Sequence, residues 1–330
     1  MKKLVAPTLT LLLILLMCSV CFAKSEEIVI GVAFRPNSEA LTFKGACRSL
    51  EAAGIRYVIL NQVLSADLKY DAQGKLLEGV DETGALNESA GKLIRCNSWQ
   101  NSNAAEIMKN ISAVIFTGGE DISPSLYYKQ EKWHGIEEER DYNAERDVSD
   151  YLLMSYCLDN DIPFLALCRG SQMLSVVSGA EIIQDIPTHF KNLSLDYHFE
   201  HRMAKPPRDF MPNNVTVIEN SLLYDITQKN FLKGAPCWHH QAIANVDNTR
   251  LKVTAYTNTG GLKMIEAIER TDKTFALGLQ FHAEMAVVKH LDNSKDKNNF
   301  LDYDTALSFF KRLEIEAENY STKNSLKQAA

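Results

Sequence analysis

The decapeptide PFLALCRGSQ, residues 163–172, decides how the rest of the sequence is interpreted. The apolar run FLAL is typical of a buried strand in a parallel sheet. This run ends at Cys168, and Gly170 then leaves space for a tight turn into the helical pattern that follows. A residue on such a turn lies at the carboxyl edge of the sheet, where open α/β proteins bind ligands. The stretch therefore predicts an α/β fold with Cys168 at the binding edge.

Segments before this stretch alternate between strand-like and helical patterns. Residues 24–34 contain the β-branched run IVIGVAF and are expected to form the first strand. Residues 38–53 have helical spacing that stops at Gly54, and IRYVIL at 55–60 follows as a second strand. This alternation predicts a mostly parallel central sheet flanked by helices. We expect one such domain over residues 24–320.

One polar segment interrupts the alternation. Residues 67–97 are polar and contain glycine, so we interpret them as a surface insertion, either an irregular excursion or a hairpin. The alternation resumes with a helix at 104–110 and a strand at 112–119. The remaining patterns predict a helix at 142–160, strands at 216–219, 250–257, 264–269 and 275–281, a final helix at 303–318 and a frayed tail at 321–330.

The first 23 residues have the layout of a secretory signal peptide. Lys2 and Lys3 precede the apolar run LLLILLM at 11–17, and the small-residue stretch CSVCFA follows. The apolar run is short for a membrane span, so we expect cleavage after Ala23 and an exported, periplasmic or secreted protein without a membrane span. A lipid-modified cysteine within CSVCFA is the alternative.

Charge and cysteine content restrict the class of protein. Loss of Lys2 and Lys3 with the leader changes the formal net charge from −7 to −9, which argues against nucleic acid as a partner. An odd number of cysteines then remains, so at least one thiol stays unpaired within a monomer, although exported proteins usually avoid free thiols. The remaining cysteines are Cys47, Cys96, Cys157, Cys168 and Cys237.

Cys168 has the position of a nucleophile. It faces the positive end of the dipole of the following helix, which favours the thiolate. The backbone N–H of Arg169 is available to bind an oxyanion, and the pair Gly118 and Gly119, which directly follows the buried apolar part of the strand at 112–119, allows a second N–H to approach a ligand. The alternative is a small buried cysteine that fills a gap in the core.

The stretch QFHAE, residues 280–284, supplies the groups that a cysteine nucleophile needs. If the strand at 275–281 continues, His282 and Glu284 project from the same face, since alternate residues of a strand share a face. The carboxylate would then orient the imidazole while the ring deprotonates the thiol. A histidine and a glutamate on an exposed strand face are the alternative, and only the fold can bring them to Cys168.

Several motifs in this order resemble the class I glutamine amidotransferase superfamily, and most closely its γ-glutamyl-γ-aminobutyrate hydrolase branch. The resemblance covers about residues 28–284. It rests on TGGEDISPSLY at 117–127, ERD at 145–147, PFLALCRGSQ at 163–172, AEIIQDIP at 180–187, CWHHQAI at 237–243, VTAYTNTGGLKMIEAIE at 253–269 and QFHAE at 280–284.

The resemblance implies a role for each candidate residue. Cys168 would be the nucleophile, His282 the base and Glu284 its orienting acid. The N–H of Arg169 and one from Gly118 or Gly119 would form the oxyanion hole. The residues implied for the pocket of the glutamyl group are Gln172, His239, His240 and Gln241.

The expected reaction is hydrolysis of a γ-glutamyl amide through a thioester, with no metal and no organic cofactor. The expected partner is this small γ-glutamyl molecule, and a homodimer is an open alternative. A second enzymatic interpretation is a glutaminase that supplies ammonia to a partner, although export argues against such a role.

Two further interpretations are not enzymatic. One is a binding protein without activity. The other is a zinc site, since two histidines lie three apart in DYHFEH and further ligand types follow downstream. The candidate zinc ligands are His198, His201, Cys237, His239 and His240.

Overall fold

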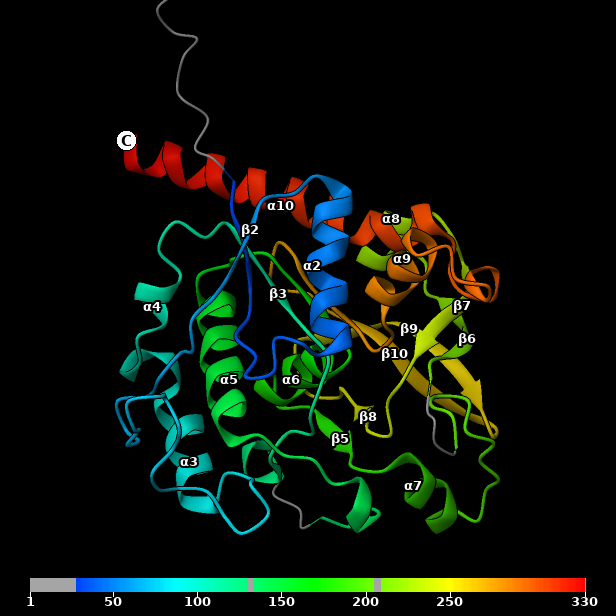
Figure 1. Cartoon of the computed structure of the whole chain (residues 1–330), viewed down its shortest axis with the longest axis horizontal. Coiled ribbons are helices and arrows are strands. Elements are labelled where there is room, and N and C mark those ends of the chain that lie inside the picture. Colours follow the sequence, from blue (N-terminus) through cyan, green and yellow to red (C-terminus); the bar gives the residue numbers. More distant parts are fainter. Residues whose placement is uncertain (1–27, 130–132, 205–208, 330) are drawn as a thin grey trace, which may run out of the picture.

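The computed structural model describes residues 28–129, 133–204 and 209–329. The predicted signal peptide at 1–23 lies outside these residues. The described chain forms one large twisted sheet with helices on both faces (Figure 1). A small second sheet pairs two short strands beside it.

The element boundaries are as follows. The strands are β1 (Ile30–Val32), β2 (Tyr57–Ile59), β3 (Ala113–Phe116), β4 (Phe164–Leu167), β5 (Glu181–Ile183), β6 (Met211–Val217), β7 (Phe231–Cys237), β8 (Ala242–Asn245), β9 (Leu251–Thr259), β10 (Leu262–Arg270) and β11 (Ala276–Leu279). The α-helices are α2 (Leu41–Ala53), α3 (Glu88–Asn97), α4 (Ala104–Ile107), α5 (Ala144–Asp159), α6 (Arg169–Val177), α7 (Ile186–Asn192), α8 (Leu222–Thr227), α9 (Ala283–Leu291) and α10 (Tyr303–Ala329). Short 3₁₀ helices lie at Ser98–Asn101, Pro124–Leu126, Glu137–Glu139 and Lys297–Asn299.

The large sheet has two halves. Its strand order is β2-β1-β3-β4-β11-β10-β9-β6-β7 in the described part of the chain. The pairings from β2 to β11 are parallel, which confirms the predicted α/β architecture. The pairings from β11 to β7 are antiparallel. A tight turn at Gly260 and Gly261 joins β9 to β10, and strands joined by so short a turn must run antiparallel.

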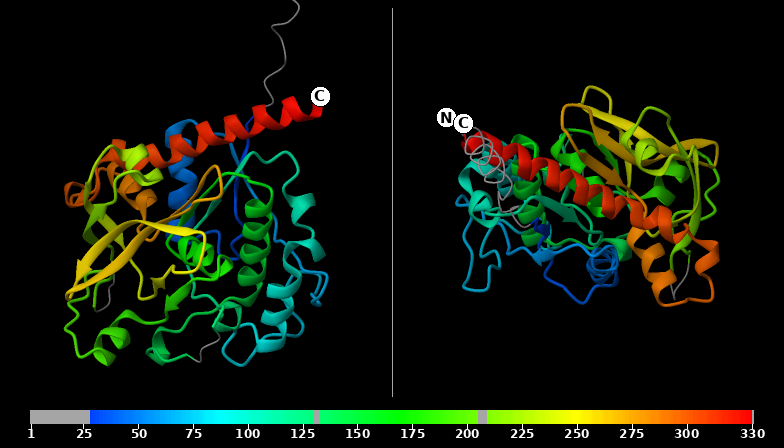
Figure 2. Two further views of the ribbon diagram at one scale, coloured as in Figure 1. Left: turned by 180° about the vertical axis from the view of Figure 1, so that it is seen from behind. Right: turned by 90° about the horizontal axis from the view of Figure 1, so that it is seen from above.

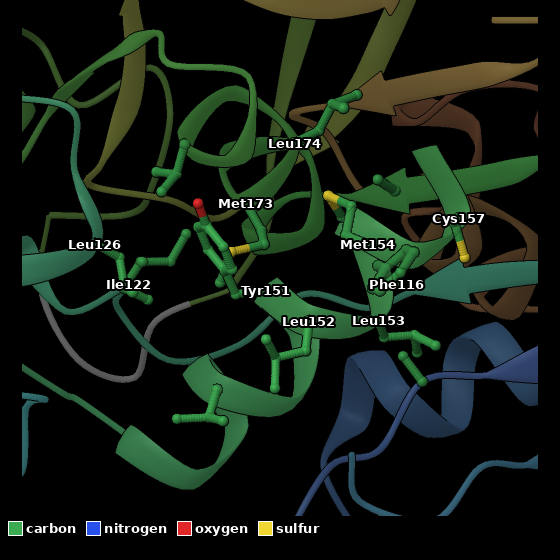
Figure 3. Packing of buried hydrophobic residues seen from close by; sticks show 14 of the residues in the cluster. Phe116, Ile122, Leu126, Tyr151, Leu152, Leu153, Met154, Cys157, Met173 and Leu174 are labelled. Carbon is green, nitrogen blue, oxygen red and sulfur yellow. The ribbon is translucent and has the colours of Figure 1, made fainter. Parts of the chain in front are cut away.

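Alternate residues of the parallel strands enter two separate cores. Val114, Phe116, Phe164 and Ala166 pack with α3, α5 and α6 on one face of the sheet. Figure 3 shows Phe116 of this core among side chains of α5 and α6, including Met154 and Met173. The intervening strand residues pack with α2, α9 and α10 on the other face. The long helix α10 lies against α2 and α9 (Figure 2). This two-sided burial explains why the strands are continuous apolar runs.

The segment 67–97 contains hairpin turns, as one of the two interpretations expected, and then a helix that neither expected. Two turns, closed by bridges between Tyr70 and Leu76 and between Val80 and Leu86, lead into α3. Leu68, Leu76, Leu86 and Ile94 are buried in the same core as α5. The segment therefore presents a polar exterior while its widely spaced apolar residues join the domain core.

A local signal marks the C-terminal end of α2 but not the end of the final helix. α2 stops at Gly54, which has a φ of 76° as expected for a glycine C-cap. The final helix, expected to end at residue 318, continues through Ala329 and includes most of the predicted frayed tail. The stretch STKNSLKQA contains neither proline nor glycine, so nothing in it stops a helix. None of the helices in the described ranges combines the length and apolar character of a membrane span.

Candidate active site

Cys168 lies on a strained turn between β4 and α6. Its φ of 50° and ψ of −105° are unfavourable for a residue with a side chain. Gly170 allows this turn, because a Cβ atom at that position would lie 2.7 Å from the carbonyl oxygen of Phe116. The turn presents the sulfur at the carboxyl edge of the sheet and places the first N–H groups of α6, which have no partner within the helix, beside it.

Parallel pairing of β4 with β11 brings the distant QFHAE stretch to this turn. Leu167 pairs with Leu279, and the N–H of Cys168 donates to the carbonyl of Leu279 over 2.7 Å. His282 comes three residues after Leu279 and lies beside Cys168. A Cβ atom on Gly118 would lie 2.7 Å from Cε1 of His282 and 3.4 Å from Cβ of Cys168. The structure therefore brings Cys168, His282 and Gly118 together at one point.

His282 is held between a carboxylate and the thiol. Its Nδ1 lies 2.6 Å from Oε1 of Glu284, and both side chains are at most 2% exposed. Burial alone would lower the pKa of His282, but Cys168 and then Glu284 outweigh this effect and raise its pKa to about 10. The ring is therefore protonated near neutral pH and acts as the cation of the group.

The expected continuation of the strand through Glu284 was wrong. β11 ends at Leu279, His282 is the residue before α9, and Glu284 lies in the first turn of that helix. His282 N–H donates to the carbonyl of Pro236 over 2.7 Å, which diverts the chain from the sheet. The two side chains still meet, because a non-helical cap residue and the second residue of the helix can face each other.

Other groups surround the sulfur of Cys168. The amide of Gln280 lies 3.7 Å from Sγ, and the carbonyl of Trp238 lies 3.9 Å from it. The ring of Phe210 packs edge-on against His282 with the centroids 5.1 Å apart. These contacts shield the imidazole while the sulfur still lines a cavity.

The glycine loop after β3 rests on buried charges. Gly119 has a φ of 149°, and a Cβ atom there would lie 2.0 Å from Nη1 of Arg146, so only glycine fits. Arg146 pairs with Glu120 and donates to the carbonyl of Thr117 over 2.9 Å. Although burial opposes ionisation of Glu120, Arg146 and Arg35 lower its pKa to about 2. The loop is therefore anchored through its own backbone and its acidic side chain.

The same charge network reaches the turn at Cys168 through the Arg169 side chain. Arg169 is fully buried and pairs with Asp150 and, over 2.5 Å, with Asp147. Burial raises the pKa of Asp147 to about 6 in spite of Arg169. Only the backbone N–H of Arg169 was predicted to have a role, and the ERD motif at 145–147 was the sequence signal for this side-chain network.

A cavity of about 180 Å³ opens beside the sulfur. All four residues implied for the glutamyl pocket line it, together with Gly119 of the predicted oxyanion loop. Most of the charged lining residues were not predicted, although the acidic pair Glu120 and Asp121 directly after Gly119 was a signal in the sequence. The lining residues are Gly119, Glu120, Asp121, Glu139, Asp141, Cys168, Gln172, Arg202, Trp238, His239, His240 and Gln241.

The predicted pocket residues have different surroundings. Gln172 donates to the carbonyl of Gln241 over 3.2 Å. His240 lies 3.0 Å from Asp121 and 3.3 Å from Asp185, and although burial opposes it, these carboxylates raise its pKa to about 9. Burial instead holds the pKa of His239 well below its usual range. The cavity therefore contains one cationic and one neutral histidine.

This arrangement suits acyl transfer better than metal or phosphate chemistry. A thiol beside a protonated, carboxylate-bound imidazole is a nucleophile with a proton donor. N–H groups from a helix terminus and from a glycine loop are the usual components of an oxyanion hole. The five cysteines of the described chain are all free thiols, so Cys168 is available for this chemistry.

Comparisons with known proteins agree with this chemistry. A sequence model of the family described as peptidase C26 matches residues 82–284. Protein NtpR of Enterococcus hirae is 32% identical over 198 residues, which cover 60% of this chain and 75% of NtpR. The γ-glutamyl-γ-aminobutyrate hydrolase PuuD of Escherichia coli is 25% identical over 181 residues, covering 54% of this chain and 66% of PuuD.

One solved structure has a comparable fold over nearly its whole length. It is a protein of Thermoplasma acidophilum that is described as a candidate component of a GMP synthase, with a TM-score of 0.51. The two share 13% identity, and the match covers 91% of this chain and 98% of that chain. At this identity the likeness concerns the fold alone.

Proposed function

Because this chain belongs to the peptidase C26 family, we propose that it is a cysteine hydrolase that cleaves γ-glutamyl amides and releases glutamate and an amine. The single observation that carries the proposal is the strained Cys168 turn beside the His282–Glu284 pair, at the edge of a polar cavity. The relation to the γ-glutamyl-γ-aminobutyrate hydrolase PuuD supports the choice of substrate class.

The reaction begins with attack of the Cys168 thiolate on the γ-carbonyl carbon. His282 holds the thiol proton as an imidazolium that Glu284 stabilises. Negative charge develops on the carbonyl oxygen, where the N–H of Arg169 and an N–H of Gly118 or Gly119 bind it. The buried pairs of Arg169 and Arg146 keep these two segments in fixed positions.

The intermediate then collapses to a thioester. His282 donates its proton to the leaving nitrogen, and the amine departs. Neutral His282 next removes a proton from water, which attacks the thioester carbonyl and frees glutamate and the cysteine. A His282 pKa of about 10 means that the enzyme rests in the form with the proton already on the ring.

The cavity suits a small zwitterionic head group. Its volume of about 180 Å³ is below the roughly 300–1,000 Å³ of drug-sized sites, so it favours an amino-acid-sized ligand. Two cations line the cavity beside their own carboxylate partners: His240 pairs with Asp121 and Asp185, and Arg202 pairs with Glu139. In the proposed complex these cations bind the α-carboxylate, and Asp141 binds the α-ammonium group. We assign the glutamyl half to this cavity and the amine to its open side.

The test is a panel of γ-glutamyl amides that differ in the amine, with glutamine included. The parent protein should release glutamate from at least one amide of a larger amine, and Cys168→Ala should lower kcat/KM by about 10⁴-fold or more. Cys96→Ser is the matched control, since Cys96 is exposed and lies outside the cavity. Equal release by the parent and Cys168→Ala would refute the assignment, and release from glutamine alone would favour the glutaminase interpretation.

We further propose that the protein is exported, on the basis of the leader-like first 23 residues. N-terminal sequencing of the protein from the native cell should find Lys24 as the first residue. An intact leader on active cytosolic protein would overturn this proposal. The hydrolase proposal would stand, because neither the site nor the family relation depends on export.

A further inference from the structure

Cys237 belongs to a buried group of side chains that is separate from the Cys168 site. The group contains two histidines, a cysteine and a glutamate, and its four members are His201, Cys237, His239 and Glu266. We propose that this group, called here the Cys237 cluster, binds one zinc-like divalent cation. The proposal does not depend on the hydrolase assignment, because it concerns binding of a metal and no step of the reaction.

The ligand atoms of the Cys237 cluster already lie close together. All four lie within 4.8 Å of one another. The Nδ1 atom of His201 is 3.1 Å from Oε1 of Glu266, and the sulfur of Cys237 is 4.0 Å from the other carboxylate oxygen. Bond lengths of about 2.0–2.3 Å imply separations of roughly 3.3–3.8 Å in a tetrahedral zinc site. Shifts of about 1 Å or less would therefore close the cluster around an ion.

His239 has one ring nitrogen whose lone pair is free. Its Nδ1 lies 2.8 Å from the carbonyl of Gln241, so Nδ1 carries the hydrogen and donates it. The other ring nitrogen, Nε2, then has a lone pair. It is buried and has no hydrogen-bond partner among the described residues. Metal-bound histidines characteristically donate their second ring N–H to a carbonyl or a carboxylate.

His201 has the same arrangement with its nitrogens exchanged. Its Nε2 lies 3.0 Å from the hydroxyl of Thr259, which can accept a hydrogen from it, and Nδ1 faces Glu266. The pair formed by Nδ1 and Oε1 lacks the alignment of a hydrogen bond, so this buried oxygen has no hydrogen-bond partner in the described chain. The amide of Asn213 lies 3.3 Å from the same nitrogen and would turn away from a bound cation.

Charge gives a second reason for a cation in this position. Glu266, His201 and Cys237 are completely buried, and a buried carboxylate without full compensation is unfavourable. A divalent cation with one thiolate, one carboxylate and two neutral imidazoles forms a neutral unit. Imidazole and thiolate ligands select zinc over magnesium or calcium. The cluster therefore matches a closed, structural type of zinc site.

The cation would join three separate segments of the chain. Cys237 ends β7 and His239 follows it by two residues, Glu266 lies on β10, and His201 lies in the segment before β6. His239 also lines the cavity beside Cys168. A bound ion would thus fix one wall of that cavity without touching the reacting sulfur.

The cluster differs from the zinc ligands expected from sequence. His198 is exposed and lies outside it, and His240 is engaged with Asp121 and Asp185. Glu266 takes their place, although nothing in its local sequence indicates a ligand. Its distance along the chain from His201 and Cys237 explains why sequence spacing did not reveal it.

The experiment uses the full chain purified without a metal-affinity tag. Chelator-treated protein is titrated with Co²⁺ and, separately, with Zn²⁺, and bound metal is measured by elemental analysis after desalting. We expect about one ion per chain, a thiolate-to-cobalt charge-transfer band, and a raised Tm with Zn²⁺, because an ion that binds only the folded state stabilises it. Absence of the band and of retained metal in the parent would overturn the proposal.

Variants identify the ligands. Cys237→Ser should abolish the charge-transfer band, and Glu266→Gln should weaken Co²⁺ binding by at least about tenfold. Cys157→Ser is the matched control, because Cys157 is an equally buried cysteine in the other core. If Cys237→Ser does not fold by circular dichroism, His239→Ala replaces it with loss of binding as the expected result. A band that persists in a folded Cys237→Ser protein would refute the assignment.

Discussion

Two neighbouring clusters in this protein contain the same residue types but have different environments. Cys168, His282 and Glu284 meet at the carboxyl edge of the parallel half of the sheet, on a strained turn before a helix. The Cys237 cluster lies in the antiparallel half, and its cysteine ends an extended strand. Only the first sulfur lines the cavity. The same types of side chain therefore face a cavity in one case and the protein interior in the other.

The difference shows that position decides the role of a thiol. Cys168 has helix N–H groups and an imidazolium beside it, and in the proposed reaction these groups bind the negative charge that develops on a substrate oxygen. Burial and the neighbouring Glu266 raise the pKa of the Cys237 thiol well above its usual range, so that without a cation this sulfur stays protonated. A metal ion would reverse this preference, because a coordinating thiol is deprotonated. Three variants each change one feature of the Cys168 site that the Cys237 cluster lacks.

The largest effect, on the free energy of unfolding, is expected when one of the buried charges that anchor the Cys168 turn is removed. Asp150→Asn leaves Arg169 and Arg146 without one of their buried partners, and breaking such a pair destabilises a protein by about 3–5 kcal/mol. Urea unfolding at neutral pH measures this loss. Asp292→Asn, which breaks the exposed pair with Arg48, is the control and should change stability by less than about 1 kcal/mol. Equal effects of both variants would mean that the buried network does not support the turn.

An intermediate effect, on activity, is expected from a side chain added at Gly118, which lies beside Cys168 and His282. A Cβ on Gly118 would lie 2.7 Å from His282, so Gly118→Ala must displace the ring from Cys168. Misplacement of a catalytic group by about 1 Å can lower the rate by about 10²-fold, or roughly 2.7 kcal/mol. The measurement is kcat/KM on the best γ-glutamyl amide together with Tm. Full activity with an unchanged fold would show that the ring does not act from this position.

The smallest effect is expected from Glu284→Gln, which changes the pKa of His282. Glu284→Gln removes one of the charges that raise its pKa to about 10, so this pKa should fall by about one unit or more, equivalent to about 1.4 kcal/mol. NMR titration of the ring measures the shift directly. In the parent protein the pKa of His282 is higher in the folded state, about 10, than its usual value of about 6.5, so this proton stabilises the folded state. The stabilisation is complete below about pH 6.5 and is lost as the pH rises through about 10. An unchanged ring pKa in the variant would contradict the role assigned to Glu284.

Features that depend on neighbouring residues were predictable from the sequence. The apolar run before Cys168, Gly170 at the turn and Gly54 at a helix end each act through the local backbone, so their patterns indicated β4, α6 and the end of α2. The pairing of His282 with Glu284 was also expected, although the structure forms it across a strand-to-helix junction. The predicted strand failed there because the N–H of His282 bonds to Pro236, a residue far away in the sequence.

The sequence by itself determined which residues could react and the alternation of strands and helices that predicts a mostly parallel sheet. Only the tertiary structure decided which cysteine faces the cavity, which buried arginines and aspartates support the turn, and that Glu266 joins His201 and Cys237. The physical reason is distance along the chain. Local patterns set backbone conformation, whereas the placement of buried charges and the meeting of strands β4 and β11 depend on packing between segments that the sequence keeps far apart.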